Sequence, residues 1–294
     1  MGIRPYPESQ PIELADRPDF IKAFKESPPL ISEFTFTNLY AWRNAYKFSV
    51  SLLDGMLIVC SGAEETKRFL NPIGKGNIKS AIEKVMGDGA GVFIRLPEQT
   101  KSLFDNDSRF VAEPDPDNAD YLYNSLDLIS LAGRKYDGKR NLIKKFRAQN
   151  VYEYIRLDAA NAQFCLEFEE AWCAIRDCDH VEGLNNERHA IKDMIGNFSA
   201  FFLIAGAIKI KGAIRGLAIA EALNPDTLVL HALKAVSDIP GLYQAMLHEF
   251  LIREAGMFRY VNLEQDLGID GLRKTKLSYH PCAMINKYTL LPVK

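Results

Sequence analysis

The chain has 294 residues, of which 47% are hydrophobic and 25% are charged, and its formal net charge is −2. These values are typical of a globular protein that buries a core. A net charge this small favours neither nucleic acid nor an anionic membrane, so any basic site has to be local. The first residues lack the pattern of a signal peptide, and no apolar run approaches the roughly 20 residues that span a bilayer. We therefore expect a cytoplasmic protein.

The cysteines predict neither a disulfide framework nor a metal site. Their number is odd at five, and no two have the Cys-x-x-Cys spacing. Cys165 and Cys173 fall on a helical apolar pattern, so we expect buried thiols there. The run from Cys178 to Glu182 also contains Asp and His, but its spacing matches no usual set of zinc ligands.

In the first part of the chain, the pattern predicts two helices, a hairpin, a strand, a helix and a strand. Asp54 and Gly55 are typical of a tight hairpin turn, because both turn positions need a positive φ. Ser32 could cap the second helix. The predicted segments are 18–27, 32–46, 48–60, 67–74, 77–89 and 91–99.

The second part repeats this order after an intervening stretch. Residues 109–124 are rich in Pro, Asp and Asn, which indicates a linker or a loop between late strands. Residues 125–150 then read as helical, with a break between Gly133 and Gly138. The remaining segments are a strand at 151–158, helices at 160–177 and 185–198, strands within 201–223 and at 227–235, a helix at 241–256, a strand at 260–268, a helix at 271–280 and a strand at 283–293.

The repeated order predicts an α+β protein with two tandem domains, at residues 1–130 and 131–294. Each is expected to be a mixed, mostly antiparallel sheet flanked by helices. The two halves share little letter-by-letter identity, so the duplication is inferred from the order of elements. A solenoid is excluded, because its repeats are much shorter.

The element order resembles the GNAT acyltransferase fold in tandem. Three segments, SEFTFTNLYAWRNAY, YDGKRNLIKKF and NLEQDLGIDGLRKTKLSYHP, are similar to the DUF2156 family. That family is related to the C-terminal domain of phosphatidylglycerol lysyltransferase and, more distantly, to the Fem aminoacyltransferases. The resemblance runs from about Ile12 to the end of the chain. It implies an acyltransferase that moves an aminoacyl group from aminoacyl-tRNA to a lipid or to another amine or hydroxyl acceptor.

Two alternatives stay open, an acyl-CoA-dependent N-acyltransferase and a non-catalytic module that binds RNA or an anionic ligand. A strand, a glycine-started helix and a second strand can hold a phosphorylated ligand on backbone N–H groups. This predicts donor binding at Ile239, Gly241 and Leu242. The GNAT family places a glycine-rich loop there, whereas this loop has one glycine, and Asp238 would repel a pyrophosphate. No cofactor is required beyond a donor, which could be aminoacyl-tRNA or acyl-CoA.

Three residues are candidates for catalysis in the second half. Glu264 and Asp266 are two apart on the predicted strand 260–268, so they should share a face. Paired carboxylates suit a general base, or could hold a substrate amino group; the alternative is a strand end that caps the next helix. His231 and Lys234 are three apart on one strand, so only one should point into the site. We select Lys234, at the end of the strand.

Further residues are candidates for binding the substrate. Arg273, Lys276 and Tyr279 should share one helix face and could bind a phosphate or a carboxylate, although Arg273 could instead pair with Asp266 or Glu264. Glu187 belongs to a polar patch on the helix 185–198, which would border the acceptor groove.

Residues 134–147 hold seven basic residues against one acid, so a helix there could bind tRNA or anionic lipid, or simply face solvent. Within this run, Tyr136 offers an aromatic face. Lys139, Arg140 and Asn141 fall in the segment that resembles the family. The acceptor is expected to be a small molecule, and the sequence predicts no oligomeric state.

Overall fold

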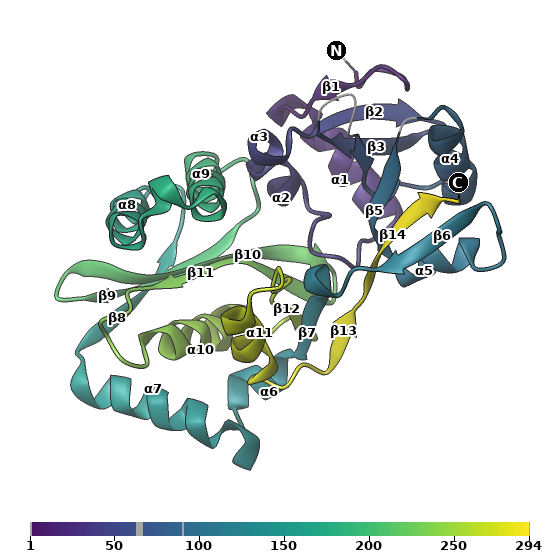
Figure 1. Cartoon of the computed structure of the whole chain (residues 1–294). Coiled ribbons are helices and arrows are strands. Elements are labelled where there is room, and N and C mark those ends of the chain that lie inside the picture. Colours follow the sequence, from purple (N-terminus) through teal and green to yellow (C-terminus); the bar gives the residue numbers. More distant parts are fainter. Residues whose placement is uncertain (1, 63–66, 90, 294) are drawn as a thin grey trace. The chain divides into compact units, whose positions relative to one another are not determined.

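Figure 1 shows the computed structural model, which describes residues 2–62, 67–89 and 91–293. The chain forms two units. Unit 1 contains residues 1–120, 265–273 and 284–294, and unit 2 contains 121–264 and 274–283. These units do not coincide with the predicted halves 1–130 and 131–294, because the C-terminal residues return to unit 1.

Unit 1 contains a sheet in the order β1-β2-β3-β4-β5-β14-β6. Asp54 and Gly55 have φ values of 50° and 82°, as the predicted hairpin between β2 and β3 requires. The described elements are β1 (Gln10–Pro11), α1 (Arg17–Glu26), α2 (Phe36–Ala41), α3 (Arg43–Tyr46), β2 (Ser49–Leu53), β3 (Met56–Ser61), β4 (Arg68–Phe69), α4 (Ile78–Gly87), β5 (Val92–Pro97), α5 (Glu98–Lys101), β6 (Phe110–Pro114) and β14 (Lys287–Pro292).

Strands β4 and β5 are parallel and are connected through α4, whereas the pairs β1–β2, β2–β3, β3–β4, β5–β14 and β14–β6 are antiparallel. Helix α4 is amphipathic and buries Ile82 and Val85 in a core that also holds Phe69 and Phe93. The predicted helix 32–46 begins later than expected. Thr35, rather than Ser32, caps it by accepting a hydrogen bond from Asn38 N at 3.0 Å.

Unit 2 contains the second sheet, in the order β13-β7-β12-β11-β10-β9-β8. Its strands β11 and β12 are parallel and are connected through α10, as β4 and β5 are through α4. The elements are β7 (Asp120–Asn124), α6 (Ser125–Ser130), α7 (Asp137–Gln149), β8 (Tyr152–Leu157), α8 (Phe164–Arg176), α9 (Glu182–Gly196), β9 (Ile204–Ile210), β10 (Ala213–Asn224), β11 (Thr227–Ala235), α10 (Leu242–Glu254), β12 (Tyr260–Asn262), α11 (Asp270–Leu277) and β13 (Ala283–Ile285).

Helices cover both faces of the unit 2 sheet. In Figure 1, α8 and α9 lie on one face, and α10 lies on the other with α7 outside it. The core between α10 and the sheet contains Phe250, Met246, Leu228 and Phe146, which are all buried. Two mostly antiparallel sheets flanked by helices confirm the predicted fold class. No helix in the described ranges combines the length and the apolar character needed to cross a membrane.

Each sheet contains a strand from the other predicted half of the chain, which we call the exchange of β7 and β14. Strand β14, at the C-terminal end of the chain, lies between β5 and β6, and β7, from the first predicted half, lies between β12 and β13. Residues 109–124, predicted as a linker or a loop, therefore contain β6 and β7. Their hydrogen-bonding partners are distant in sequence, which a local pattern does not show. The predicted final strand 283–293 divides into β13 and β14.

Cys173 forms a disulfide with Cys178, so the expectation of a buried thiol at Cys173 was wrong. Asp177 has a left-handed φ of 56°, which reverses the chain after α8 and brings the two Cα atoms to 5.1 Å. Five residues of separation allow this contact only after that reversal, which the sequence pattern did not reveal. Cys165 is buried as predicted, and burial raises the pKa of its thiol to about 12.

Candidate functional site

Strand β11 directs two cationic side chains to one face of the unit 2 sheet. Its register with β10 shifts between Ile219 and Ala220, which leaves His231 as an extra residue in a β-bulge. The His231 ring contacts Glu221 of β10. Lys234 pairs with Leu217 of β10, which is four residues from Glu221 and so lies on the same face of that strand. His231 and Lys234 therefore lie on the same face. The prediction that only one of them could do so was wrong, because simple alternation does not hold across a bulge.

The ammonium group of Lys234 is held by residues of α8 and α9. Its Nζ atom is 2.7 Å from Glu169 Oε1 and 3.1 Å from Glu187 Oε2. It also lies 3.9 Å from the centre of the Trp172 ring, and Trp172 Nε1 donates to Ala235 O at 3.2 Å. Lys234 is only 4% exposed. The structure thus brings together two predicted residues, Lys234 and Glu187, with two that were missed.

Glu169 is the most unusual member of this cluster. Its side chain is fully buried, and its Oε2 atom has no hydrogen-bond partner among the described residues. Burial raises the pKa of Glu169, and the nearby Lys234 opposes that rise only in part. A buried carboxyl group with a raised pKa and an unused oxygen is suited to receiving a proton.

A second charged cluster surrounds His231. Its Nε2 atom is 2.8 Å from Glu221 Oε1, and its Nδ1 atom is 2.9 Å from Glu264 Oε1. Burial alone would lower the pKa of His231, but the hydrogen bonds to both carboxylates raise it to about 10. The ring is therefore an imidazolium at neutral pH and donates from both nitrogens.

Together the two clusters form what we call the acidic face of unit 2. It comprises Lys234, Glu169, Glu187, Trp172, His231, Glu221 and Glu264. Two cationic side chains meet four carboxyl groups there, so acidic groups are in excess. Such an excess attracts a substrate that carries an ammonium group.

Asp266 and Arg273 lie in unit 1, in the segment 265–273. Asp266 accepts from Gly268 N at 2.8 Å and from Arg273 Nε at 2.9 Å, and Arg273 also pairs with Asp117 at 2.7 Å. Strand β12 ends at Asn262, and Glu264 has a left-handed φ of 57°, so the expected strand face does not extend to Asp266. The pairing of Asp266 with Arg273 is the structural alternative that the sequence left open.

Four predicted binding residues meet near the end of α11 in unit 2. Lys139 Nζ lies 2.6 Å from Ser278 Oγ and 4.0 Å from the centre of the Tyr279 ring. Tyr136 donates from its hydroxyl to Tyr279 O at 3.1 Å, and Lys276 Nζ lies 2.5 Å from Leu263 O. Burial lowers the pKa of Lys139 and raises that of Tyr279. These contacts hold the segment together, and a role in binding substrate stays a prediction.

Arg140 and Asn141 differ in exposure on the basic helix α7. Arg140 donates to the carbonyl groups of Leu131 and Gly133 and pairs with Asp137, so it closes the turn before the helix. Asn141 is exposed. The basic run nevertheless leaves several cations on the outer surface of α7, including Lys144 and Lys145.

The predicted donor loop has a packing role in the structure. Gly241 has a φ of 81°, and a Cβ atom there would lie 2.4 Å from the carbonyl oxygen of Leu142 on α7. Glycine is therefore required because α7 approaches the start of α10 closely. Leu242 is fully buried in the core, and the carbonyl of Ile239 accepts a hydrogen bond from its N–H.

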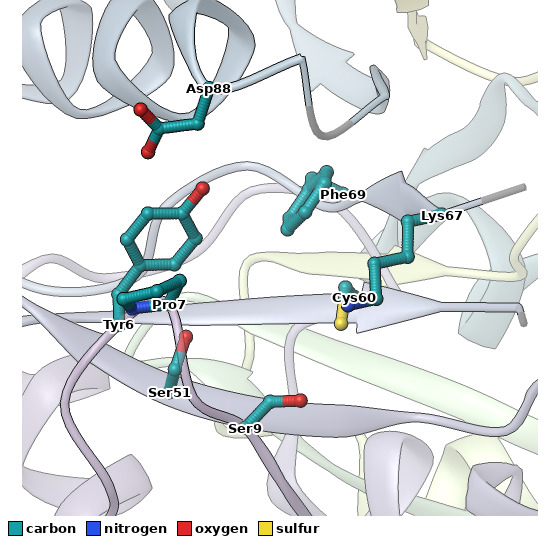
Figure 2. A pocket seen from close by; sticks show the side chains of 8 residues that line it. All are labelled: Tyr6, Pro7, Ser9, Ser51, Cys60, Lys67, Phe69 and Asp88. Carbon is teal, nitrogen blue, oxygen red and sulfur yellow. The ribbon is translucent and has the colours of Figure 1, made fainter. Parts of the chain in front are cut away.

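A small pocket lies in unit 1 and contains none of the predicted site residues (Figure 2). Its volume is about 140 Å³, below the roughly 300 Å³ at which ligand pockets begin. Burial raises the pKa of Tyr6, beside Asp88, to about 12. The lining residues are Tyr6, Pro7, Ser9, Ser51, Cys60, Lys67, Phe69 and Asp88. Within the described ranges, no group of three or more His, Cys, Asp or Glu side chains is arranged so that it could hold a metal ion.

Residues 24–291 match the family model described as phosphatidylglycerol lysyltransferase, C-terminal. This match covers nearly the whole chain and confirms the resemblance predicted from three segments. None of the curated protein sequences matches the chain.

Solved structures also resemble this chain. A conserved protein of unknown function from Bacteroides thetaiotaomicron is 32% identical, with a TM-score of 0.89, over 97% of this chain and 99% of its own. The L-PGS structure from Bacillus licheniformis is 13% identical, with a TM-score of 0.66, over 99% and 93%. The C-terminal DUF2156 domain of a protein from Agrobacterium fabrum, assigned as a lysylphosphatidylglycerol synthetase, is 12% identical, with a TM-score of 0.68, over 96% and 93%. At such low identity, the last two show a shared fold.

Proposed function

Because the chain belongs to the family of the phosphatidylglycerol lysyltransferase C-terminal domain, we propose that it is an aminoacyltransferase. The donor is aminoacyl-tRNA, and the acceptor is an amine or hydroxyl group of a lipid or another small molecule. The observation that supports this proposal best is the buried Lys234 ammonium beside Glu169, a carboxyl group with an unused oxygen. The proposed site is the acidic face of unit 2.

The reaction needs a polarised ester carbonyl, an acceptor that loses a proton, and close contact between the two. The acceptor nitrogen or oxygen forms a bond to the carbonyl carbon, and the bond from that carbon to the ribose oxygen breaks. Glu169 receives the acceptor proton and returns it to the leaving ribose oxygen. The Lys234 ammonium stabilises the negative charge that develops on the carbonyl oxygen.

The partly exposed carboxylates at the edge of the acidic face have a different role. Glu187 and Glu264 keep 32% and 20% of their side-chain surface. They are therefore accessible to the ammonium group of an aminoacyl donor, which a cationic site would repel. An acyl-CoA donor has less support, because the start of α10 is closely packed at Gly241 and Asp238 would repel a pyrophosphate.

The proposal is tested with the purified chain, aminoacyl-tRNA and candidate acceptors. Wild type should release the aminoacyl group from tRNA and yield an aminoacylated acceptor by mass spectrometry. The double variant Lys234→Met/Glu169→Gln removes both charges together and should lower the rate by about 10²–10³-fold. Lys211→Ala, an exposed lysine on the β9–β10 turn, is the matched control and should be unaffected.

Cells provide the second half of this test. Lipids and peptidoglycan precursors of wild-type and deletion cells would be compared by mass spectrometry. No difference in either class, together with no transfer by the purified chain, would refute the tRNA-dependent reaction. A rate that the double variant leaves unchanged would remove the acidic face as the site.

A further inference from the structure

A group of exposed apolar side chains surrounds the junction of α6 and α10 in unit 2. Leu126 is 76% exposed, Met257 is 81% exposed and Ile252 is 43% exposed. Two hydrogen bonds hold their elements together. Ser125 N donates to Arg259 O at 3.0 Å, and His248 Nε2 lies 3.0 Å from Ile129 O. Large apolar side chains that gather at one exposed place are candidates for a binding surface.

The positions of these two bonds place the three residues around the same junction. Leu126 follows Ser125 directly, and Met257 is two residues from Arg259, so the first bond places both near the junction. Ile252 is one helical turn after His248 on α10, so it extends the stripe that begins at the second bond. We call Leu126, Ile252 and Met257 the junction patch.

Basic side chains border the junction patch. Arg147 and Arg253 both pair with the single carboxylate of Glu249, so one positive charge is left over. Arg259 is exposed and adds another. Lys144, one turn before Arg147 on α7, is exposed and adds a third.

Two exposed acids lie in the same region and reduce this charge without cancelling it. Asp127 already pairs with Lys135 at 3.7 Å. Asp226 lies in the turn between β10 and β11, and its backbone carbonyl accepts a hydrogen bond from Tyr260 N. Three surplus cations against one acid outside an ion pair leave the surroundings of the junction patch positive.

We propose that the junction patch docks the protein on the surface of an anionic lipid bilayer. Leu126, Ile252 and Met257 would enter the boundary between headgroups and acyl chains, while the arginines stay among the headgroups. Long basic side chains suit this position, because their stems are apolar and their charged ends can reach the headgroups. The docking does not depend on the proposed transfer reaction.

Charge and chemistry favour a bilayer over two other occupants. A second copy of this chain would bring the same surplus of arginine and lysine against itself across a symmetric interface, which is repulsive. RNA is bound by cations together with rings that stack on bases, whereas the junction patch presents aliphatic and thioether side chains. Both occupants are therefore outcomes that the experiment must exclude.

The experiment measures binding of the full chain to vesicles without tRNA or any acyl donor. Vesicles of phosphatidylcholine alone are compared with vesicles in which about one third of the lipid is anionic, either phosphatidylglycerol or phosphatidylserine. We expect binding to both anionic kinds, weaker binding as salt rises, and little binding to the neutral vesicles. A docking surface responds to surface charge, so the two anionic lipids should be equivalent.

The variant Leu126→Asp/Met257→Asp should lower the partition coefficient by about tenfold or more, because two exposed apolar side chains no longer enter the lipid. Ile175→Asp is the matched control. Ile175 is 72% exposed on α8, which covers the opposite face of the unit 2 sheet, and this variant should bind as wild type does. Unchanged melting temperatures would show that the variants fold.

Four results would overturn the proposal. These are the absence of binding to either anionic vesicle, an equal loss in the Ile175→Asp control, binding to phosphatidylglycerol alone, and unchanged binding in the double aspartate variant. Loss of self-association in that variant would reassign the patch to a second copy. Loss of tRNA binding in Arg259→Ala, with vesicle binding intact, would reassign it to RNA. Because no aminoacyl donor is present, the transfer reaction could fail without affecting any of these results.

Discussion

Each unit contains a buried lysine between two carboxylates, but the two clusters differ in how completely they are satisfied. In unit 1, Lys287 Nζ lies within 2.8 Å of both Glu33 oxygens and 2.6 Å from Asp120 Oδ1. Ser32 donates to both Asp120 oxygens, at 2.7 and 2.9 Å. In unit 2, the Oε2 atom of Glu169 has no partner among the described residues.

This difference separates a structural network from a candidate site. When every oxygen in a buried cluster has a donor, the cluster stabilises one conformation but offers nothing to a substrate. A buried carboxyl group with an unused oxygen costs stability, and such a cost is typical of functional sites. The residue types alone do not distinguish the two clusters.

The largest expected effect comes from removing each lysine in turn. Lys287→Met should lower the free energy of unfolding by about 3–5 kcal/mol, because two buried carboxylates lose their main partner. Lys234→Met should cost less, because Lys234 donates to one oxygen of Glu169, whereas Lys287 donates to both oxygens of Glu33 and to one of Asp120. Denaturant unfolding at pH 7 measures both. Equal losses would remove the distinction between the two clusters.

The second test uses pH. The pKa of His231 is raised from 6.5 to about 10 in the folded protein. Its stabilising contribution is therefore complete below pH 6.5 and is lost as the pH rises toward 10. Between pH 7 and 9, wild type should lose about 2–3 kcal/mol more than His231→Gln. Burial alone would lower the pKa of Lys287, but the carboxylates of Asp120 and Glu33 raise it, so Lys287 should keep its proton in this range. Parallel pH profiles of wild type and variant would contradict the assigned charge of His231.

The smallest effect concerns the completeness of the unit 1 network. Ser32→Ala removes the hydroxyl donor to Asp120 and should lower the free energy of unfolding by about 1–2 kcal/mol. Ser102→Ala is a matched control, since its hydroxyl bonds Glu98 O at an exposed position and should cost less than about 0.5 kcal/mol. Urea titration of both variants would show whether Asp120 needs all its donors.

Local patterns predicted most of the helices and strands, because their causes are local. The turn at Asp54 and Gly55 is an example, as is the amphipathic helix α4. The exchange of β7 and β14 depends on pairing between distant residues, and a short stretch of sequence carries no signal of such pairing. The bulge at His231 likewise depends on how β11 meets β10.

Part of the candidate site could have been found in the sequence. The sequence predicts Lys234 and Glu187 as site residues, whereas Glu169 is not among the predicted residues. Glu169 is four residues before Cys173 and four after Cys165, so it lies on the apolar stripe of α8. Burying a carboxylate on such a stripe costs free energy unless the carboxylate has a partner. The position of Glu169 in the sequence therefore indicates a buried polar contact.

The exchange of β7 and β14 also constrains how the chain acquires its structure during synthesis. The sheet of unit 1 lacks its strand between β5 and β6 until residues 287–292 have emerged from the ribosome. Until then, β5 and β6 present open hydrogen-bonding edges, which other chains could join. Strands β5 and β6 are thus made well before their common neighbour in the sheet, and a stop codon before residue 287 would leave the sheet of unit 1 without the strand between them.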